Sequence, residues 1–195
     1  GTQGNLLALL SHCERGDEYI TGMGAHTYLH EAGGGAVLGS IQPQPLPINS
    51  RGELDLDDVA AAIKPDDYHY AKTRLLCLEN TQGGRVLSIN YMQQAGEIAK
   101  KHGLKFHLDG ARVFNAAVKL EQPVSTITSL FDSVSICLSK GLAAPVGSVL
   151  VGDIETISKA RRLRKMVGGG MRQAGILAAA GIYALTRQVD RLADD

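Results

Sequence analysis

One lysine of the sequence, Lys140, stands out because its neighbours are apolar. The apolar run 134–138 precedes it, and Gly141, Leu142 and two alanines follow it. Removing an ammonium group from water is costly, so burial in such surroundings would lower the pKa of Lys140 and favour the neutral amine. A neutral amine is a nucleophile and forms imines with aldehydes. Taken alone, the pattern still favours a lysine that ends a strand and extends its side chain to water.

A carboxylate and an anion site could act together with this amine. Asp109 directly follows the apolar segment 104–108, and residues 1–4, with the sequence GTQG, directly precede a leucine-rich helix. Glycines and a hydroxyl at a helix N-terminus bind anions because free N–H groups point at the ligand, although a simple cap by Thr2 explains the same pattern. An amine for an aldehyde, a carboxylate for a ring nitrogen and a phosphate site are the set that pyridoxal phosphate chemistry requires.

The segment 22–31 carries His26, Tyr28 and His30 in what is predicted to be a loop. A lone histidine in a loop is usually solvated or bonded for structural reasons. The alternative is a ring that stacks on a flat cofactor, or a base that works near neutral pH. The three glycines at 33–35 lack the spacing and the preceding strand of a dinucleotide fingerprint, so a Rossmann site is not expected.

The composition is that of a globular protein. Of the 195 residues, 44% are hydrophobic and 21% are charged, and Lys plus Arg equal Asp plus Glu at 20 each. This neutral balance argues against a nucleic-acid surface. Three scattered cysteines fit reduced thiols, so a cytoplasmic location is expected. The longest apolar stretch, 174–185, is shorter than the ~18–20 residues that cross a bilayer, so no membrane span is expected and a buried helix is predicted there.

Strands and helices alternate along the chain, which predicts an α/β fold with a mainly parallel sheet. The predicted strands are 17–20, 73–78, 104–108 and 134–138, and the predicted helices are 5–15, 55–63, 89–102 and a segment around 114–118. Ligands in such folds bind beyond the carboxyl ends of the strands, where Asp109, Lys140 and the turn 79–81 all lie. The basic run 159–165, on a helix that begins at Asp153, is interpreted as a solvated or subunit-facing surface.

Five stretches, taken in order, resemble the L-threonine aldolases, which are pyridoxal-phosphate enzymes of the aspartate-aminotransferase fold. They are GTQGN (1–5), AHTYLHEAG (25–33), FHLDGARVFN (106–115), CLSKGLAAPVGS (137–148) and GGGMRQA (168–174). The resemblance covers essentially the whole chain. It implies a mixed, mainly parallel sheet of the seven-stranded type, flanked by helices and truncated at both ends. Residues 1–167 would be the large cofactor domain, and 168–195 a glycine hinge and a buried helix leading to a missing C-terminal small domain.

The resemblance also implies roles for individual residues. Lys140 matches the lysine that holds the cofactor as a Schiff base, and Asp109 matches the partner of the pyridine nitrogen. Gly1 and Thr2 match the turn that binds the phosphate. His26 matches the histidine that stacks on the cofactor and lies near the substrate hydroxyl, which makes it the expected base. No metal site is implied.

Two arginines and one departure complete the comparison with the family. Arg112 matches an arginine near the cofactor and the substrate carboxylate, and Arg172 matches one that reaches the cofactor of a neighbouring subunit. After the strand 73–78 the family usually has Glu-Asn-Thr-His, where this sequence has Gln82 in the last position. Glutamine can bond to substrate but cannot act as a base near neutral pH, so the substitution bears on rate and on diastereomer preference.

The activity implied is the retro-aldol cleavage of L-threonine or L-allo-threonine to glycine and acetaldehyde, in a cytoplasmic homo-oligomer, a dimer of dimers, that binds neither nucleic acid nor membrane. Two alternatives stay open at this point. One is a different pyridoxal-phosphate reaction on the same scaffold, β-elimination or transamination. The other is a paralogue that has lost catalysis and acts as a binding or assembly protein, for which Gln82 is the one hint in the sequence.

Overall fold

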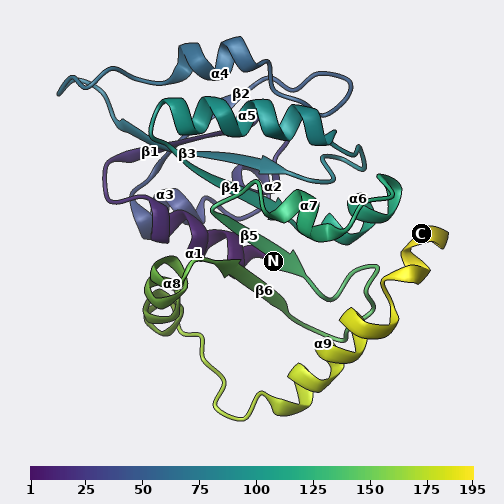
Figure 1. Ribbon diagram of the computed structural model, residues 1–195. Helices are drawn as coiled ribbons and strands as arrows, with labels where there is room; N and C mark the ends of the chain where they lie inside the picture. The colour runs from purple at the N-terminus through teal and green to yellow at the C-terminus, as the bar shows by residue number, and fades with distance from the viewer.

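The computed structural model describes all residues 1–195 and is built around one six-stranded sheet (Figure 1). The strands are β1 (Asp17–Gly22), β2 (Gln42–Leu46), β3 (Lys72–Glu79), β4 (Lys105–Gly110), β5 (Ser133–Cys137) and β6 (Ser148–Gly152). Their order across the sheet is β2-β1-β3-β4-β5-β6; all neighbouring pairs are parallel except β5 and β6, which are antiparallel. The mixed, mainly parallel α/β sheet is confirmed, with six strands where seven were expected.

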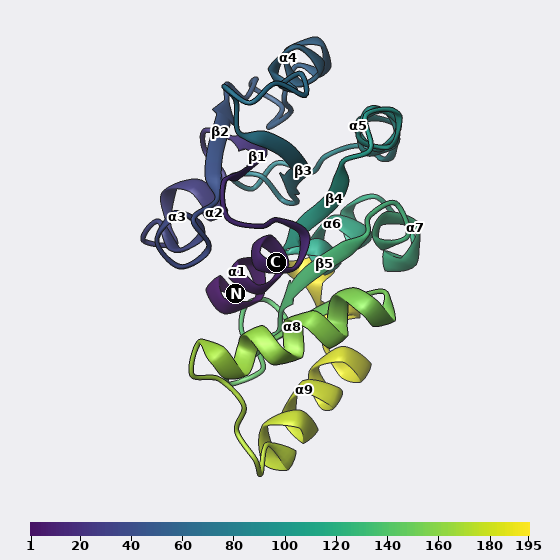
Figure 2. The same cartoon turned by 90° about the vertical axis from the view of Figure 1, so that its left-hand side faces the viewer.

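Helices cover both faces of this sheet, as the turned view in Figure 2 makes clear. They are α1 (Thr2–His12), α2 (His26–Leu29), α3 (Gly34–Gly39), α4 (Leu56–Ala62), α5 (Ile89–Lys101), α6 (Val113–Lys119), α7 (Val124–Thr128), α8 (Ile154–Met166) and α9 (Gly175–Arg187), followed by the 3-10 helix η1 (Asp190–Asp194). Helices α4 to α7 lie on one face. Helices α1, α3 and α8 lie on the other, where α1 also packs against α8.

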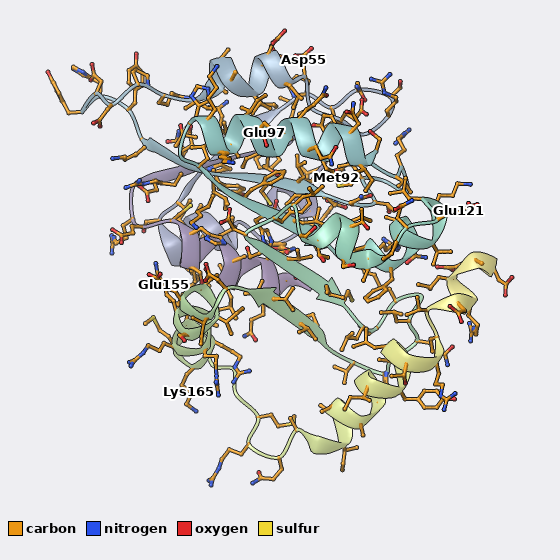
Figure 3. All side chains as sticks on the ribbon, in the orientation of Figure 1. Asp55, Met92, Glu97, Glu121, Glu155 and Lys165 are labelled. Atoms are coloured by element: carbon orange, nitrogen blue, oxygen red, sulfur yellow. The ribbon has the colours of Figure 1, made fainter.

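Alternating strand residues divide the core between these two faces. Leu76 and Leu78 of β3 belong to the large cluster under α4 to α7, whereas Leu75 and Cys77 of the same strand pack against α1. Met92 is fully buried and points from α5 toward the sheet in Figure 3. A strand buried on both faces is mostly apolar, which is why β3 could be found in the sequence as a continuous apolar run.

Side-chain caps fix the starts of several helices. Asp55, Ser88 and Asp153 each accept a backbone N–H of the following helix, so α4, α5 and α8 begin where the sequence predicts. Helix α1 begins three residues earlier than expected, with Gly1 as its cap residue and no side-chain capping bond. Thr2 is therefore inside the helix and is not its cap. The predicted loop 22–31 contains the short helix α2.

The apolar helix predicted at 174–185 forms as α9, but the prediction that it is buried is wrong. Only Gly181 and Ala184 of α9 are buried, and Ile176 is 86% exposed. An apolar sequence shows that the helix carries apolar side chains. It does not show whether other residues of the chain cover them. The glycines 168–170 lie in the connection between α8 and α9. Two exposed residues of α8, Glu155 and Lys165, are labelled in Figure 3. No helix combines the length and apolar character needed to cross a bilayer.

Candidate active site

The side chains predicted to do chemistry follow the carboxyl ends of neighbouring parallel strands. His26 comes after β1, Glu79 ends β3, Asp109 lies near the end of β4, and Lys140 follows β5. Glu79 and Asp109 are partners in the parallel pairing of β3 and β4. A parallel sheet brings such ends to one edge, so residues from four separate segments meet there.

Asp109 is buried, with 3% of its surface exposed, and both of its oxygens accept hydrogen bonds. Its Oδ2 accepts the Asn5 side-chain amide at 2.7 Å, and its Oδ1 accepts the Ala111 backbone N–H at 3.1 Å. These two donors, from different elements, hold the carboxylate in one orientation. Asn5 lies in the first turns of α1, so Asp109 is tied directly to the start of that helix.

His26 is held by two carboxylates from different elements. Its backbone N–H donates to Glu79 Oε2 at 2.7 Å, and its ring Nδ1 lies 2.9 Å from Glu31 Oε1. The same Glu31 oxygen accepts the Asn5 amide at 2.8 Å, so it acts as an acceptor and Nδ1 of His26 carries the donated proton. In the neutral ring Nε2 then bears the free lone pair. The side chain is 40% exposed, so this nitrogen is in reach of a ligand at the sheet edge.

Burial perturbs both carboxyl groups around His26. Burial raises the pKa of Glu31, and the hydrogen bonds from Asn5 and His26 offset part of that rise. Burial raises the pKa of Glu79 to about 7, opposed by the hydrogen bond from the His26 backbone and by the positive charge of Lys140. His26, Glu31 and Asp109 each present a polar atom within 4.8 Å of the others, so the site is a compact cluster of coupled groups.

The raised pKa of Glu79 predicts a pH-dependent stability. Glu79 binds a proton more tightly in the folded protein, with a pKa of about 7, than in the unfolded chain, where 4.5 is the ordinary value. The stabilisation from this bound proton is therefore complete below the unfolded-state pKa of 4.5, and it is lost as the pH rises through the folded-state pKa of about 7. Glu79→Gln, which keeps an acceptor for His26, should therefore stabilise the protein at about pH 8, by up to about 3 kcal/mol, and leave it unchanged at about pH 4.5.

Urea unfolding of the full-length protein without cofactor at these two pH values measures the effect. Glu97→Gln, on the exposed side of α5, is the matched control and should leave the pH dependence as in the wild type. Equal pH dependence of Glu79→Gln and the wild type would contradict the assignment of the titration to Glu79.

Lys140 lies past the end of β5 and extends to water, the alternative that the local pattern favoured over burial. The side chain is exposed, while Leu142 and Ala144 turn inward and pack against Ala184 and Leu192. The apolar neighbours in the sequence thus form a small core of their own beneath the segment, and the lysine is left facing the open edge of the sheet. Its amine is accessible to a ligand, and its charge acts on Glu79.

The two predicted arginines lie in different places. Arg112 is exposed at the start of α6 and lies beside Lys140, with no space between them large enough for a water molecule. Arg172 is exposed and is not among the residues beside Lys140; it belongs to the connection between α8 and α9, a segment that runs along the bottom of Figure 1. The structure therefore brings Arg112 to Lys140 and does not bring Arg172 to it within this chain.

Gly1 and Thr2 form the exposed start of α1. A side chain at Gly1 would meet no atom within 4 Å. The first N–H groups of α1 have no partner within the helix, which is the requirement for holding an anion. The bond from Asn5 to Asp109 fixes the distance between this turn and the carboxylate.

Gln82 is buried and bonds to backbone. Its Nε2 donates to the Gly24 carbonyl at 3.0 Å, two residues before His26, and its stem packs against Gly52. Its amide therefore supports the turn that carries His26. A substrate contact remains a prediction.

Sequence reasoning did not single out Asn5, Glu31 or Glu79 as site residues, although all lay inside or beside motifs that it used. Asn5 is one turn into a helix whose start drew attention only through Thr2 and the glycines. Glu31 follows His26 by five residues, a spacing with no meaning until the turn of α2 is known. Only the packing of α1 against β4 and β5 brings Asn5 to Asp109, 104 positions away.

The chain is similar in sequence to proteins named as threonine aldolases. The chain is 60% identical over 195 residues to the low specificity L-threonine aldolase of Escherichia coli K12 and 51% identical over 201 residues to a probable low-specificity L-threonine aldolase 2 of Arabidopsis thaliana. It is covered completely in both alignments and spans 59% and 57% of those proteins.

Solved structures share the fold at lower identity. A putative L-allo-threonine aldolase from Listeria monocytogenes matches with a TM-score of 0.84 and 21% identity, over 100% of this chain and 53% of that one. A probable N-succinyldiaminopimelate aminotransferase from Thermus thermophilus matches with a TM-score of 0.73 and 23% identity, over 98% of this chain and 51% of that one. The family described as beta-eliminating lyases matches residues 1–195, and the chain belongs to that family.

Proposed function

We propose that the protein is a pyridoxal-phosphate-dependent aldehyde-lyase that cleaves L-threonine and L-allo-threonine to glycine and acetaldehyde. The observation that carries this proposal is the meeting of an exposed lysine, a buried carboxylate, an oriented histidine and an exposed helix N-terminus at one edge of the sheet. The identity of 60% to a protein named as a low specificity L-threonine aldolase supports it.

The chemistry of these groups fits the cofactor. An accessible amine at Lys140 suits its aldehyde, and a carboxylate fixed by two donors at Asp109 suits a protonated ring nitrogen. The exposed first turn of α1 at Gly1 and Thr2 suits its phosphate. His26 and Arg112 are the exposed groups left to face the ring and the substrate carboxylate. When bound, pyridoxal 5'-phosphate supplies an electron sink for the pair released as the Cα–Cβ bond breaks.

The residues of this chain then divide the work of cleavage. Asp109 would hold the protonated ring nitrogen of the cofactor, and Lys140 would hold its aldehyde. His26 takes the proton of the β-hydroxyl at Nε2, because Glu31 fixes the proton of the neutral ring at Nδ1. Arg112, an exposed guanidinium beside Lys140, is the candidate to bind the substrate carboxylate.

The test of the proposed function is the yield of glycine and acetaldehyde from L-threonine and L-allo-threonine with the full-length protein and cofactor. Release of both products supports it and also measures the effect of Gln82 on diastereomer preference. β-Elimination is the second candidate, because the matching family is described as beta-eliminating lyases. Ammonia and a keto acid without glycine would replace the first proposal by the second.

The role of His26 predicts a selective loss of activity. His26→Asn keeps a side-chain N–H for Glu31 but removes the base, so kcat for threonine cleavage should fall by about 10²–10⁴-fold. His30→Asn is the matched control, since His30 is exposed with its ring centroid 5.4 Å from that of His26. Glycine production by each variant is the measurement. Near-full activity of His26→Asn would assign the base to another group or to water.

The proposal extends to the location, the pathway and the assembly of the protein. We place the protein in the cytoplasm, in threonine breakdown and glycine formation, as a homotetramer in which Arg172 reaches the cofactor of a neighbouring subunit. Three free, buried cysteines and the exposed apolar side of α9 support the location and the assembly, respectively. Residues 1–167 would form the cofactor domain, with 168–195 leading to a small domain.

A further inference from the structure

A row of polar side chains lies buried between α1 and the strands β4 and β5, behind the site. His107, Ser133 and Asn5 are at most 1% exposed, and His12 extends the row to the end of α1. The contacts are continuous: His12 Nε2 to Ser133 Oγ at 2.7 Å, Ser133 Oγ to His107 Nδ1 at 2.8 Å, and His107 Nε2 to Asn5 Oδ1 at 3.5 Å. Asn5 Nδ2 then reaches Asp109 and Glu31.

The two carboxylates determine where every proton in this row lies. Their oxygens accept, so the Asn5 amide presents its NH₂ group to them and its carbonyl oxygen to His107. That oxygen can only accept, so His107 carries its proton on Nε2 and has a lone pair on Nδ1. The Ser133 hydroxyl must then donate to Nδ1, and its oxygen accepts from Nε2–H of His12. Each group donates in the same direction, toward Asp109 and Glu31.

Burial keeps both imidazoles neutral, which this order requires. Burial lowers the pKa of His107 to about 3 and the nearby His12 lowers it further, whereas a hydrogen bond with the Ser133 backbone raises it. Burial also lowers the pKa of His12 to about 4; Asp132 and Asp153 raise it, and Lys105 and Lys159 lower it. A second proton on the His107 ring would sit on Nδ1 and face the hydrogen that the Ser133 hydroxyl donates.

We propose that His107 and Ser133 are positioning residues, which hold the Asn5 amide so that both of its N–H bonds point at Asp109 and Glu31. His12 closes the outer end of the row. The row thus fixes the Asp109 carboxylate. It also fixes the Glu31 carboxylate, which in turn orients the His26 ring. No residue of the row touches substrate or cofactor. The effect on cofactor binding rests on the proposed function, whereas the order of the protons does not.

The order of the protons is measured without cofactor by nitrogen NMR of histidine in the full-length protein labelled with ¹⁵N-histidine. His107 should be a neutral ring with its proton on Nε2 throughout the range from about pH 5 to pH 9. A proton on Nδ1, or a charged ring in that range, overturns the proposal. This measurement needs only the wild-type protein once a His107→Gln variant has assigned the resonance, so it does not depend on how well other variants fold.

Ser133→Ala tests the link within the row, and Ser135→Ala is its matched control. Ser135 is on the same face of β5, is also 2% exposed or less, and takes no part in the row. Without the hydroxyl donor, His107 should populate both tautomers, and the Kd for pyridoxal 5'-phosphate should rise about fivefold to tenfold, the value of one hydrogen bond. Ser135→Ala should stay within about twofold of the wild type on the same scale.

Equal tautomer spectra and equal Kd values for the two serine variants would overturn the positioning role, because a purely structural serine would not alter the His107 ring. If no form of the protein binds pyridoxal 5'-phosphate, the proposed function fails, and the NMR spectra still decide the order of the protons.

Discussion

Replacing Lys140 with alanine is expected to abolish threonine cleavage and covalent attachment of pyridoxal phosphate. Lys140 supplies an exposed amine at the end of β5, close enough to Glu79 for its charge to act on that carboxyl group. Removing a group that bonds covalently during the reaction costs about 10⁴–10⁶-fold in kcat. Glycine production measures this loss. Borohydride reduction followed by peptide mass spectrometry locates the attached pyridoxyl group.

Lys101→Ala is the matched control for this substitution. Lys101 is exposed in the last turn of α5 and has no ion-pair partner, so its removal changes the charge by the same amount away from the site. The control should keep full activity and a labelled Lys140 peptide. A specifically reduced pyridoxyl adduct in the Lys140→Ala protein would show that another amine holds the cofactor.

Asp109→Asn is expected to lower kcat by about 10²–10³-fold or more, the typical result of removing one preorganised electrostatic group. The amide has nearly the shape of the carboxylate but no charge to keep a ring nitrogen protonated. It also conflicts with its neighbours. The two Asp109 oxygens accept from Asn5 and Ala111, so an NH₂ group in either place faces another donor. Steady-state kinetics and the pH dependence of the absorption of the bound cofactor measure the effect.

Asp153→Asn is the control for the second substitution. Asp153 accepts the Thr156 N–H at the start of α8, and asparagine caps helices equally well. This variant makes the same chemical change with little cost in stability, so it should retain wild-type kcat. A kcat for Asp109→Asn within about threefold of the wild type would remove Asp109 from the role of ring-nitrogen partner.

The exposed face of α9 shows how local pattern and tertiary environment separate. The run 174–185 correctly predicts a helix, because its residues favour one and no proline interrupts it. The inference from apolar composition to burial fails, because burial depends on which other segments reach the helix. The same separation applies to Lys140, whose apolar neighbours pack into their own cluster and leave the amine outside.

The sequence by itself determined which residues end the parallel strands, because a strand buried on both faces reads as an apolar run and its polar turn follows directly. It thereby placed Asp109, Lys140 and the turn 79–81 at one edge, and the alternation of elements predicted the α/β class. Only the tertiary structure decided how those residues are held. The strand order β2-β1-β3-β4-β5-β6 does not follow chain order, and it lays α1 across β4 and β5. That packing brings Asn5 to Asp109 and Glu31 and places His107 and Ser133 behind it, contacts between residues 26 to 104 positions apart that no local spacing encodes.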